Sequence, residues 1–368
     1  MLSEREIDPG AIDLVDWPAL VALANRQSVA PVLYSRLKDR AAALPLEAAA
    51  GLRESYLASA ARNMRVFHEL NQILVAFRAA EVSVIPIKGA HLARAVYDDV
   101  ALRQMTDIDL WVPRDQLETA RRVMQSLGYT AHSKADRPQA LQDALAGETQ
   151  MFKAGATLVE LHWNIFPGEW VRHTAKVDEQ EVWDRSIPFD GDAERQLSPE
   201  DAIVHLCVHL AVNHQMSGIG LRTLVDLDRA RQKWSVDWKV VAQRARAWRV
   251  STATWIVLSA LAELFGDPEK QLPLQALAPS RLRQTILHRF AAPERLASGL
   301  NLSAGPRRFL FLLALVDRPA DAIRLAWRAL FPDRVWLTLR YESPDASSWL
   351  VWRLRFGHLV NVATRGDV

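Results

Sequence analysis

Two aspartates, Asp107 and Asp109, stand two residues apart in the segment DIDLWV, whose polar and apolar residues alternate as in a β-strand. Residues two apart on a strand point to the same face, so the two carboxylates are expected to lie side by side. A divalent cation such as Mg²⁺ relieves the repulsion between such carboxylates. The alternative interpretation of this pattern alone is a solvent-exposed edge strand with two surface aspartates.

A second polar strand face follows in residues 157–166, where Glu160 and His162 share one side and apolar residues occupy the other. Two aspartates on one strand and a glutamate on a later strand can form a three-carboxylate cluster. Such a cluster is what holding two magnesium ions for phosphoryl or nucleotidyl transfer requires. Taken by itself, the second strand also fits an ordinary solvated sheet face.

Positive charge precedes the aspartates. Lys88 and Gly89 stand where a short apolar segment, Val82–Ile87, gives way to a helical pattern. Backbone N–H groups and the dipole at a helix start attract phosphate, glycine permits close backbone approach, and lysine supplies a point charge. Arg103 adds a second cation just before the aspartates. These residues are therefore predicted to hold a triphosphate, with ordinary surface charge as the alternative.

The elements that must position these residues are predicted as an α+β arrangement, a small mixed sheet flanked by N-terminal helices and a larger C-terminal helical domain. We expect a helical segment at 1–80, the α/β core at 81–166, a connector at 167–196 and the helical domain at 197–368. The expected strands are Val82–Ile87, Asp107–Val112, Tyr129–Ser133, Met151–Lys153 and Thr157–Phe166.

The C-terminal half begins with a strong helix-start pattern, in which Ser198 is the expected cap and Pro199 the first helical residue. His205 and His209 lie four residues apart on this helix. A zinc pair is one interpretation, but the segment has no H-E-x-x-H arrangement and no cysteine or carboxylate at ligand spacing. We predict instead that His209 points from the helical domain toward the nucleotide.

Composition limits the class of protein. The chain has 368 residues, a formal net charge of +2 and one cysteine, Cys207. Its first ten residues lack the apolar core of a signal peptide, and the longest apolar run, Phe309–Val316, is too short to span a bilayer. We therefore expect a cytoplasmic protein without a transmembrane segment.

Arginines and tryptophans alternate through the last hundred residues. This pattern could contact nucleic acid or a membrane surface. Acidic residues are mixed in, however, and tryptophan at helical spacing more often belongs to a core. We therefore favour core packing and do not expect a nucleic-acid partner, and the sequence leaves the oligomeric state open.

The segments IPIKGAHLARAVYDD, LRQMTDIDLWV and VELHWNIF, in this order, resemble the nucleotidyltransferase superfamily with the polymerase-β-like fold, and in particular its bacterial branch of nucleotidyltransferase family proteins. The resemblance covers most of the chain. It implies magnesium-dependent transfer of a nucleoside monophosphate from an NTP such as ATP to a small-molecule, peptide or protein acceptor, by a two-metal mechanism. The implied metal ligands and catalytic residues are Asp107, Asp109 and Glu160, and the implied nucleotide contacts are Lys88, Gly89, Arg103, His162 and His209.

The chain departs from the superfamily pattern at Ala90, which stands where a serine usually follows the glycine. This departure motivates an alternative, a catalytically weak nucleotidyltransferase-like binding protein of the antitoxin type. Arg222 and Asp226 lie four apart on a predicted helix over Leu221–Arg231. They are expected to form either a helix-surface ion pair or, as the resemblance implies, part of the substrate-side wall.

Overall fold

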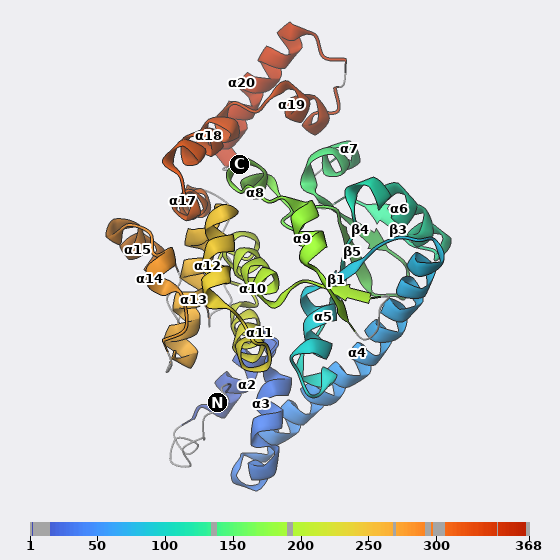
Figure 1. Ribbon diagram of the computed structural model, residues 1–368, viewed down its shortest axis with the longest axis vertical. Coiled ribbons are helices and arrows are strands. Elements are labelled where there is room, and N and C mark those ends of the chain that lie inside the picture. Colours follow the sequence, from blue (N-terminus) through green and yellow to red (C-terminus); the bar gives the residue numbers. More distant parts are fainter. Residues whose placement is uncertain are drawn as a thin grey trace.

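A computed structural model of the chain describes residue 2 and residues 15–133, 138–189, 194–267, 270–290, 296, 306–343 and 345–365. The N-terminal residues used to test for a signal peptide lie mostly outside this set. Helices surround one five-stranded sheet, with one long N-terminal helix along one side and the C-terminal helices on the other (Figure 1). This arrangement confirms the predicted fold class.

The N-terminal segment contains α2 (Trp17–Arg26), α3 (Ala30–Leu37), the 3₁₀ helix η1 (Lys38–Ala43) and the long α4 (Leu46–Ala79). Asp16 caps α2, because its side chain accepts a hydrogen bond from the backbone N–H of Ala19 at 3.0 Å. The helix α4 runs along one edge of the molecule, from α3 to the sheet (Figure 1).

The sheet has the order β1-β2-β5-β4-β3. Only β2 and β5 are parallel neighbours; the other three pairs are antiparallel, so the sheet is mixed as predicted. Its strands are β1 (Ile85–Ile87), β2 (Asp107–Trp111), β3 (Thr130–His132), β4 (Glu148–Phe152) and β5 (Leu158–His162), and each overlaps or adjoins an expected strand.

Between the strands lie α5 (Lys88–Ala95), η2 (Val100–Leu102), η3 (Arg114–Gln116), α6 (Leu117–Ser126), α7 (Gln139–Leu141) and the π-helix η4 (Gln142–Ala146). One face of the sheet is apolar and packs against α4 and α6. Its buried residues include Ile108, Leu110, Val159 and Leu161. The opposite face carries Asp109, Glu160 and His162, so the strand alternation separates a core face from a polar one.

The segment expected as a connector contains regular structure that its sequence patterns did not reveal. It forms α8 (Glu169–Thr174), α9 (Glu179–Arg185) and a hairpin of β6 (Ile187–Phe189) and β7 (Glu194–Gln196). The strand β7 contacts β1, and two side chains hold it to α5: His91 hydrogen-bonds Gln196, and Arg94 forms an ion pair with Glu194. The hairpin thus fixes the helix that begins at Lys88.

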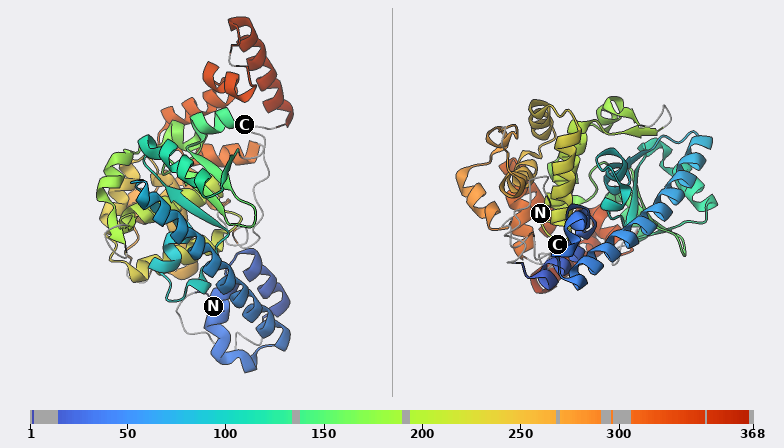
Figure 2. Two further views of the ribbon diagram at one scale, coloured as in Figure 1. Left: turned by 90° about the vertical axis from the view of Figure 1, so that its right-hand side faces the viewer. Right: turned by 90° about the horizontal axis from the view of Figure 1, so that it is seen from below.

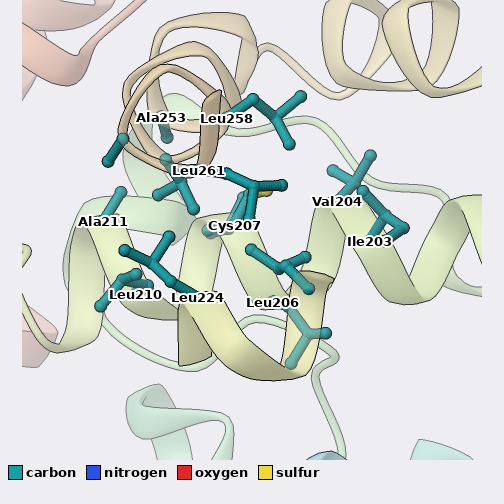
Figure 3. Packing of buried hydrophobic residues seen from close by; sticks show 14 of the residues in the cluster. Ile203, Val204, Leu206, Cys207, Leu210, Ala211, Leu224, Ala253, Leu258 and Leu261 are labelled. Carbon is teal, nitrogen blue, oxygen red and sulfur yellow. The ribbon is translucent and has the colours of Figure 1, made fainter. Parts of the chain in front are cut away.

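The C-terminal helices form the larger of the two main cores. They are α10 (Pro199–Val208), the π-helix η5 (His209–Asn213), α11 (Gly220–Lys233), α12 (Trp238–Ala247), α13 (Ser251–Phe265), α14 (Leu274–Leu277), α15 (Arg281–His288), α17 (Pro306–Leu315), α18 (Pro319–Leu330), α19 (Arg334–Arg340) and α20 (Ser348–Arg365). Ser198 caps α10 as predicted. Cys207 lies at the centre of the packing, among Leu224 of α11 and Leu258 and Leu261 of α13 (Figure 3).

The two N-terminal helices share this core rather than packing on the sheet. Gln27, just after α2, donates a hydrogen bond to the Leu296 carbonyl and accepts one from the Leu221 N–H. The apolar residues of α3, such as Leu33, belong to the same hydrophobic cluster as α10 and α13. The chain therefore crosses from the helical half to the sheet along α4, and the predicted segment boundaries stay a prediction.

The aromatic residues of the last helices are exposed. Trp327 of α18 and Trp349, Trp352 and Phe356 of α20 are 61–70% exposed, which corrects the expectation that these tryptophans belong to the core. Figure 2 shows that α18 to α20 project from one end of the molecule, where little of the chain is available to cover them. Among the described residues, no helix combines the length and the apolar character needed to cross a membrane.

Candidate active site

Strand register brings the predicted acidic residues together. Asp109 on β2 pairs directly with Glu160 on the parallel strand β5, and on its other side with Ile87, the last residue of β1. Lys88 follows Ile87 and therefore enters the same cluster. Three segments that are distant in the sequence thus meet at one point on the polar face of the sheet.

Lys88 is held over the two carboxylates in a left-handed backbone conformation, with φ of 51°. A residue with a side chain adopts this conformation at a cost on the order of 1–3 kcal/mol, and such residues concentrate at functional sites. The Nζ of Lys88 lies 2.7 Å from Oδ1 of Asp109 and 3.9 Å from Oε2 of Glu160. The strained turn therefore directs the ammonium group into the acidic cluster.

Lys88 and Asp109 each shift the pKa of the other. Burial alone would lower the pKa of Lys88, but the charges of Asp109 and Glu160 outweigh burial and raise it. Burial would likewise raise the pKa of Asp109, yet the Lys88 cation and the hydrogen bond with His162 hold that pKa well below its usual range. Both groups are consequently charged at neutral pH.

His162 completes the cluster and is fully buried. Its Nε2 lies 2.9 Å from Oδ1 of Asp109 and 3.8 Å from Oε2 of Glu160. Its Nδ1 lies 3.3 Å from Oε2 of Glu148 on β4, without the geometry of a hydrogen bond. The ring is therefore surrounded by the carboxylates of Asp109, Glu160 and Glu148, which lie on the neighbouring strands β2, β5 and β4.

Asp107 lies on the same face, one strand repeat before Asp109, and is partly exposed. Burial of its carboxyl and the negative charge of Asp109 raise its pKa. The atoms grouped closely enough to bind one ion come from Asp109, Glu160 and His162, not from Asp107. Asp107 therefore stands at the edge of the cluster, where it can reach a ligand that also contacts Asp109.

These groups have the separations that a bound cation requires. The ligand atoms of Asp109, Glu160 and His162 all lie within 4.8 Å of one another. Bonds of about 2.1 Å to a six-coordinate ion place neighbouring ligands roughly 3.0 Å apart and opposite ligands roughly 4.2 Å apart. The observed 2.9 and 3.8 Å fall at or within these limits. The residues present thus fit a divalent metal ion.

Comparison with known proteins bears on the same residues. A family model described as "Uncharacterised nucleotidyltransferase" matches residues 13–266, which is more than half of the chain and includes the whole sheet. The chain belongs to this nucleotidyltransferase family. Comparison with curated proteins gave no match.

Among solved structures, the chain is similar to the antibiotic-resistance factor ANT(2'')-Ia, studied in solution for its substrate-regulated conformational dynamics. The two share 14% sequence identity with a TM-score of 0.30 over 48% of this chain and 90% of the other. The family assignment stands on the family model alone, because a likeness at this level adds nothing to it.

In this member of the family, the loop before β2 is held by polar side chains of α4. Asn63 donates hydrogen bonds to the carbonyls of Val100 and Arg103 and accepts one from the N–H of Met105, and Ser59 donates to the Ala101 carbonyl. Sequence inspection assigned no site role to α4. The signal available was two small polar residues spaced one helical turn apart within an otherwise apolar stripe.

Gly89 lies close to the end of this loop, and its predicted contact with phosphate stays a prediction. A Cβ at Gly89 would stand 3.3 Å from Cγ of Met105 and 3.4 Å from Nη1 of Arg103. Arg103 itself is buried, and its Nε donates to both carboxylate oxygens of Asp226 at 2.7 and 2.9 Å. Tyr97 donates to the same carboxylate. Arg103 thus lies beside the residues predicted to bind phosphate, and its Nε is already bound to Asp226. A contact between Arg103 and phosphate stays a prediction.

Arg222 stands next to this pair. Sequence spacing suggested a surface ion pair with Asp226 as one alternative, but both residues are buried and Asp226 bonds Arg103 instead. Burial and the nearby Arg103 charge lower the pKa of Arg222 to about 10, and its Nε has no hydrogen-bond partner. Arg222 therefore offers a buried guanidinium edge between α11 and the start of β2.

The helical half contributes histidines. Burial, followed by the charge of Lys88, lowers the pKa of both His205 and His209, that of His205 to about 3. Both rings are therefore neutral at pH 7. His205 stacks on Phe166, whereas His209 opens the π-helix η5, is partly exposed and contacts the ring of His214. Both rings thus lie close enough to Lys88 to feel its charge, and contact of His209 with a nucleotide stays a prediction.

Proposed function

We propose that this chain catalyses divalent-metal-dependent transfer of a nucleoside monophosphate from an NTP to an acceptor hydroxyl or phosphate. The observation that carries the proposal is the juxtaposition of Asp109, Glu160 and Lys88, in a chain that belongs to a nucleotidyltransferase family. Transfer of this kind needs carboxylates to hold metal and a cation to receive the triphosphate at one point.

In the proposed reaction, an acceptor oxygen attacks the α-phosphorus of the NTP, and an acceptor hydroxyl releases its proton to solvent as the new phosphorus–oxygen bond forms. The bond from the α-phosphorus to the bridging oxygen breaks, and pyrophosphate leaves with the released electron pair. Asp107, Asp109 and Glu160 would hold two Mg²⁺ ions, which lower the charge on the reacting phosphate. Lys88, together with the N–H groups at the start of α5, which no side chain caps, would bind the departing phosphates.

The charges near α11 support a path for the rest of the triphosphate. Arg222 has a buried, unpartnered Nε and lies close enough to Asp107 to feel its charge. Arg103 lies beside it. We assign these two guanidinium groups to the phosphates farther from the metal, and His209 to the side from which the nucleotide or acceptor enters.

The test is transfer of label from [α-³²P]NTP in the presence of Mg²⁺, with wild type, Asp107→Asn and Asp109→Asn compared. Wild type should release pyrophosphate and label an acceptor supplied in a cell extract or by the protein itself. Either aspartate change should reduce transfer by at least 100-fold, because each removes a charge that the metal requires. Equal turnover by wild type and both variants would overturn the proposal.

A second candidate is a catalytically weak nucleotidyltransferase-like binding protein. Two observations favour it: Ala90 replaces the usual serine hydroxyl, and the Lys88 ammonium bonds the carboxylate expected to bind metal. Isothermal titration with each NTP distinguishes the two candidates. Heat of binding that depends on Mg²⁺ supports the enzyme, whereas no such heat with any NTP supports the binding protein. An AMP-sized mass increase on co-expressed proteins would identify a protein acceptor.

A further inference from the structure

His162 lies where carboxylates from neighbouring strands converge. Its two ring nitrogens face carboxylate oxygens on opposite sides, Asp109 at 2.9 Å and Glu148 at 3.3 Å. Nε2 also lies 3.8 Å from Oε2 of Glu160, so one imidazole nitrogen and the oxygens of two carboxylates meet within 4.8 Å of one another. The ring is fully buried, and its Nδ1 has no hydrogen bond.

A cation between Nε2 and the carboxylates of Asp109 and Glu160 would take its ligands from these three groups. The ring would then carry its proton on Nδ1, facing Glu148, and offer the Nε2 lone pair to the ion. This is the carboxylate–histidine–metal arrangement, in which an outer carboxylate fixes the tautomer of a ligating histidine. The Nδ1 is buried without a hydrogen bond, and an oxygen of Glu148 lies 3.3 Å from it.

We propose that Asp109, Glu160 and His162 form a mixed oxygen and nitrogen site for a divalent first-row transition metal, with His162 as a direct ligand through Nε2. The inference rests on the proposed function, which places a divalent ion at these carboxylates, and deepens it by naming the class of ion. Mg²⁺ favours all-oxygen ligation, whereas an imidazole ligand shifts the preference toward Mn²⁺, Fe²⁺ or Zn²⁺.

The position of Lys88 is consistent with such a site. Its Nζ lies 2.7 Å from the same Asp109 oxygen that His162 contacts. The ammonium group therefore occupies the Asp109 oxygen that the ion would bind, and it must withdraw from that oxygen when the ion binds. Lys88 is then free to approach a phosphate oxygen of the NTP.

The experiment uses Mn²⁺ alone, added in equimolar amount to the full-length chain after chelator treatment, and pulsed electron paramagnetic resonance. A directly bound imidazole gives ¹⁴N modulation of the Mn²⁺ echo, which changes on ¹⁵N-histidine labelling. We expect this modulation in wild type and its loss in His162→Gln, with Mn²⁺ affinity lower by at least tenfold and Mg²⁺ affinity reduced less. The control is His91→Gln, which removes another buried histidine, bonded to Gln196.

Mn²⁺ bound without ¹⁴N modulation in wild type, or modulation that persists in His162→Gln, would overturn the inference. If His162→Gln does not fold, Glu148→Gln decides: we expect it to keep the modulation and to bind Mn²⁺ about 10–100-fold more weakly, as changes to outer carboxylates do. Unchanged affinity in Glu148→Gln would count against the assignment. Label transfer from [α-³²P]NTP is measured separately, so oxygen-only ligation with active transfer would leave the proposed function standing.

Discussion

Replacing Lys88 with methionine tests whether its ammonium group compensates the acidic cluster. The change keeps the length of the side chain and its strained backbone but removes the charge that lies 2.7 Å from Asp109. Removing one partner of a buried ion pair costs about 3–5 kcal/mol, because the other charge stays buried without compensation. For a chain of this length, roughly 2 °C of melting temperature corresponds to each kcal/mol, so the expected decrease is about 6–10 °C.

The assay is thermal unfolding in a chelating buffer, followed by titration with Mn²⁺. The cation should stabilise Lys88→Met more than wild type, because no ammonium group competes for the Asp109 oxygen. At a concentration 100 times its dissociation constant, the ion adds about 2.7 kcal/mol of stability, so most of the lost melting temperature should return.

A matched control comes from Lys233, whose ammonium pairs with Asp98 at 2.6 Å while both side chains are exposed to solvent. Lys233→Met should cost less than about 1 kcal/mol, since exposed ion pairs contribute little. Equal stability of Lys88→Met and wild type in chelator would refute the compensating role. Equal stabilisation of both by Mn²⁺ would refute the competition between Lys88 and the ion.

Three further predictions concern other parts of the chain. Asn63→Leu should lower stability by about 2–4 kcal/mol and weaken metal-dependent NTP binding, because three backbone groups of the loop before β2 lose their hydrogen-bond partner. Unfolding measures the first effect and titration calorimetry the second. Unchanged NTP affinity would show that α4 does not position this loop. Burial raises the pKa of Glu179 to about 7, so the stability of the wild type falls as pH rises from 4.5 to 7. Glu179→Gln should therefore stabilise the fold by about 1–3 kcal/mol at pH 8 and leave it unchanged below pH 4.5. Parallel pH profiles of stability for the two proteins would contradict this cause. Trp163→Ala should cost about 3–5 kcal/mol and Trp352→Ser less than about 0.5 kcal/mol in denaturant unfolding, because the first ring is buried and the second is 70% exposed.

The strand alternation was the most informative pattern in the sequence. It predicted that Asp109 and Glu160 occupy the polar face of the sheet while Ile108 and Leu161 occupy the core face, and the structure agrees. Helix-start chemistry was equally local, so the caps at Asp16 and Ser198 were predictable from a few residues each. Patterns with a period of two or of a single turn depend on local geometry, which the sequence carries directly.

Partners across elements could not be predicted in the same way. Helical spacing offered an ion pair between Arg222 and Asp226 as one of two alternatives, but Asp226 accepts from Arg103, which lies in a loop more than one hundred residues earlier. The cluster around His162 depends on β4 lying beside β5, which brings Glu148 to the imidazole. The prediction that the tryptophans of α20 belong to a core was wrong for another reason. Helical spacing shows that residues share a face, but not what covers that face.

The balance of charge on the polar face explains why these long-range contacts converge there. A single ammonium group, that of Lys88, faces the carboxylates of Asp109 and Glu160, with Glu148 and Asp107 next to them. Burial and the negative charge of Asp109 raise the pKa of Asp107, although the Lys88 and Arg222 cations lower it. An arrangement of this kind is costly for folding alone, because like charges are gathered in a partly desolvated place. The cost is offset when a divalent cation binds, so the feature that weakens the isolated fold is the one that prepares it for metal and nucleotide.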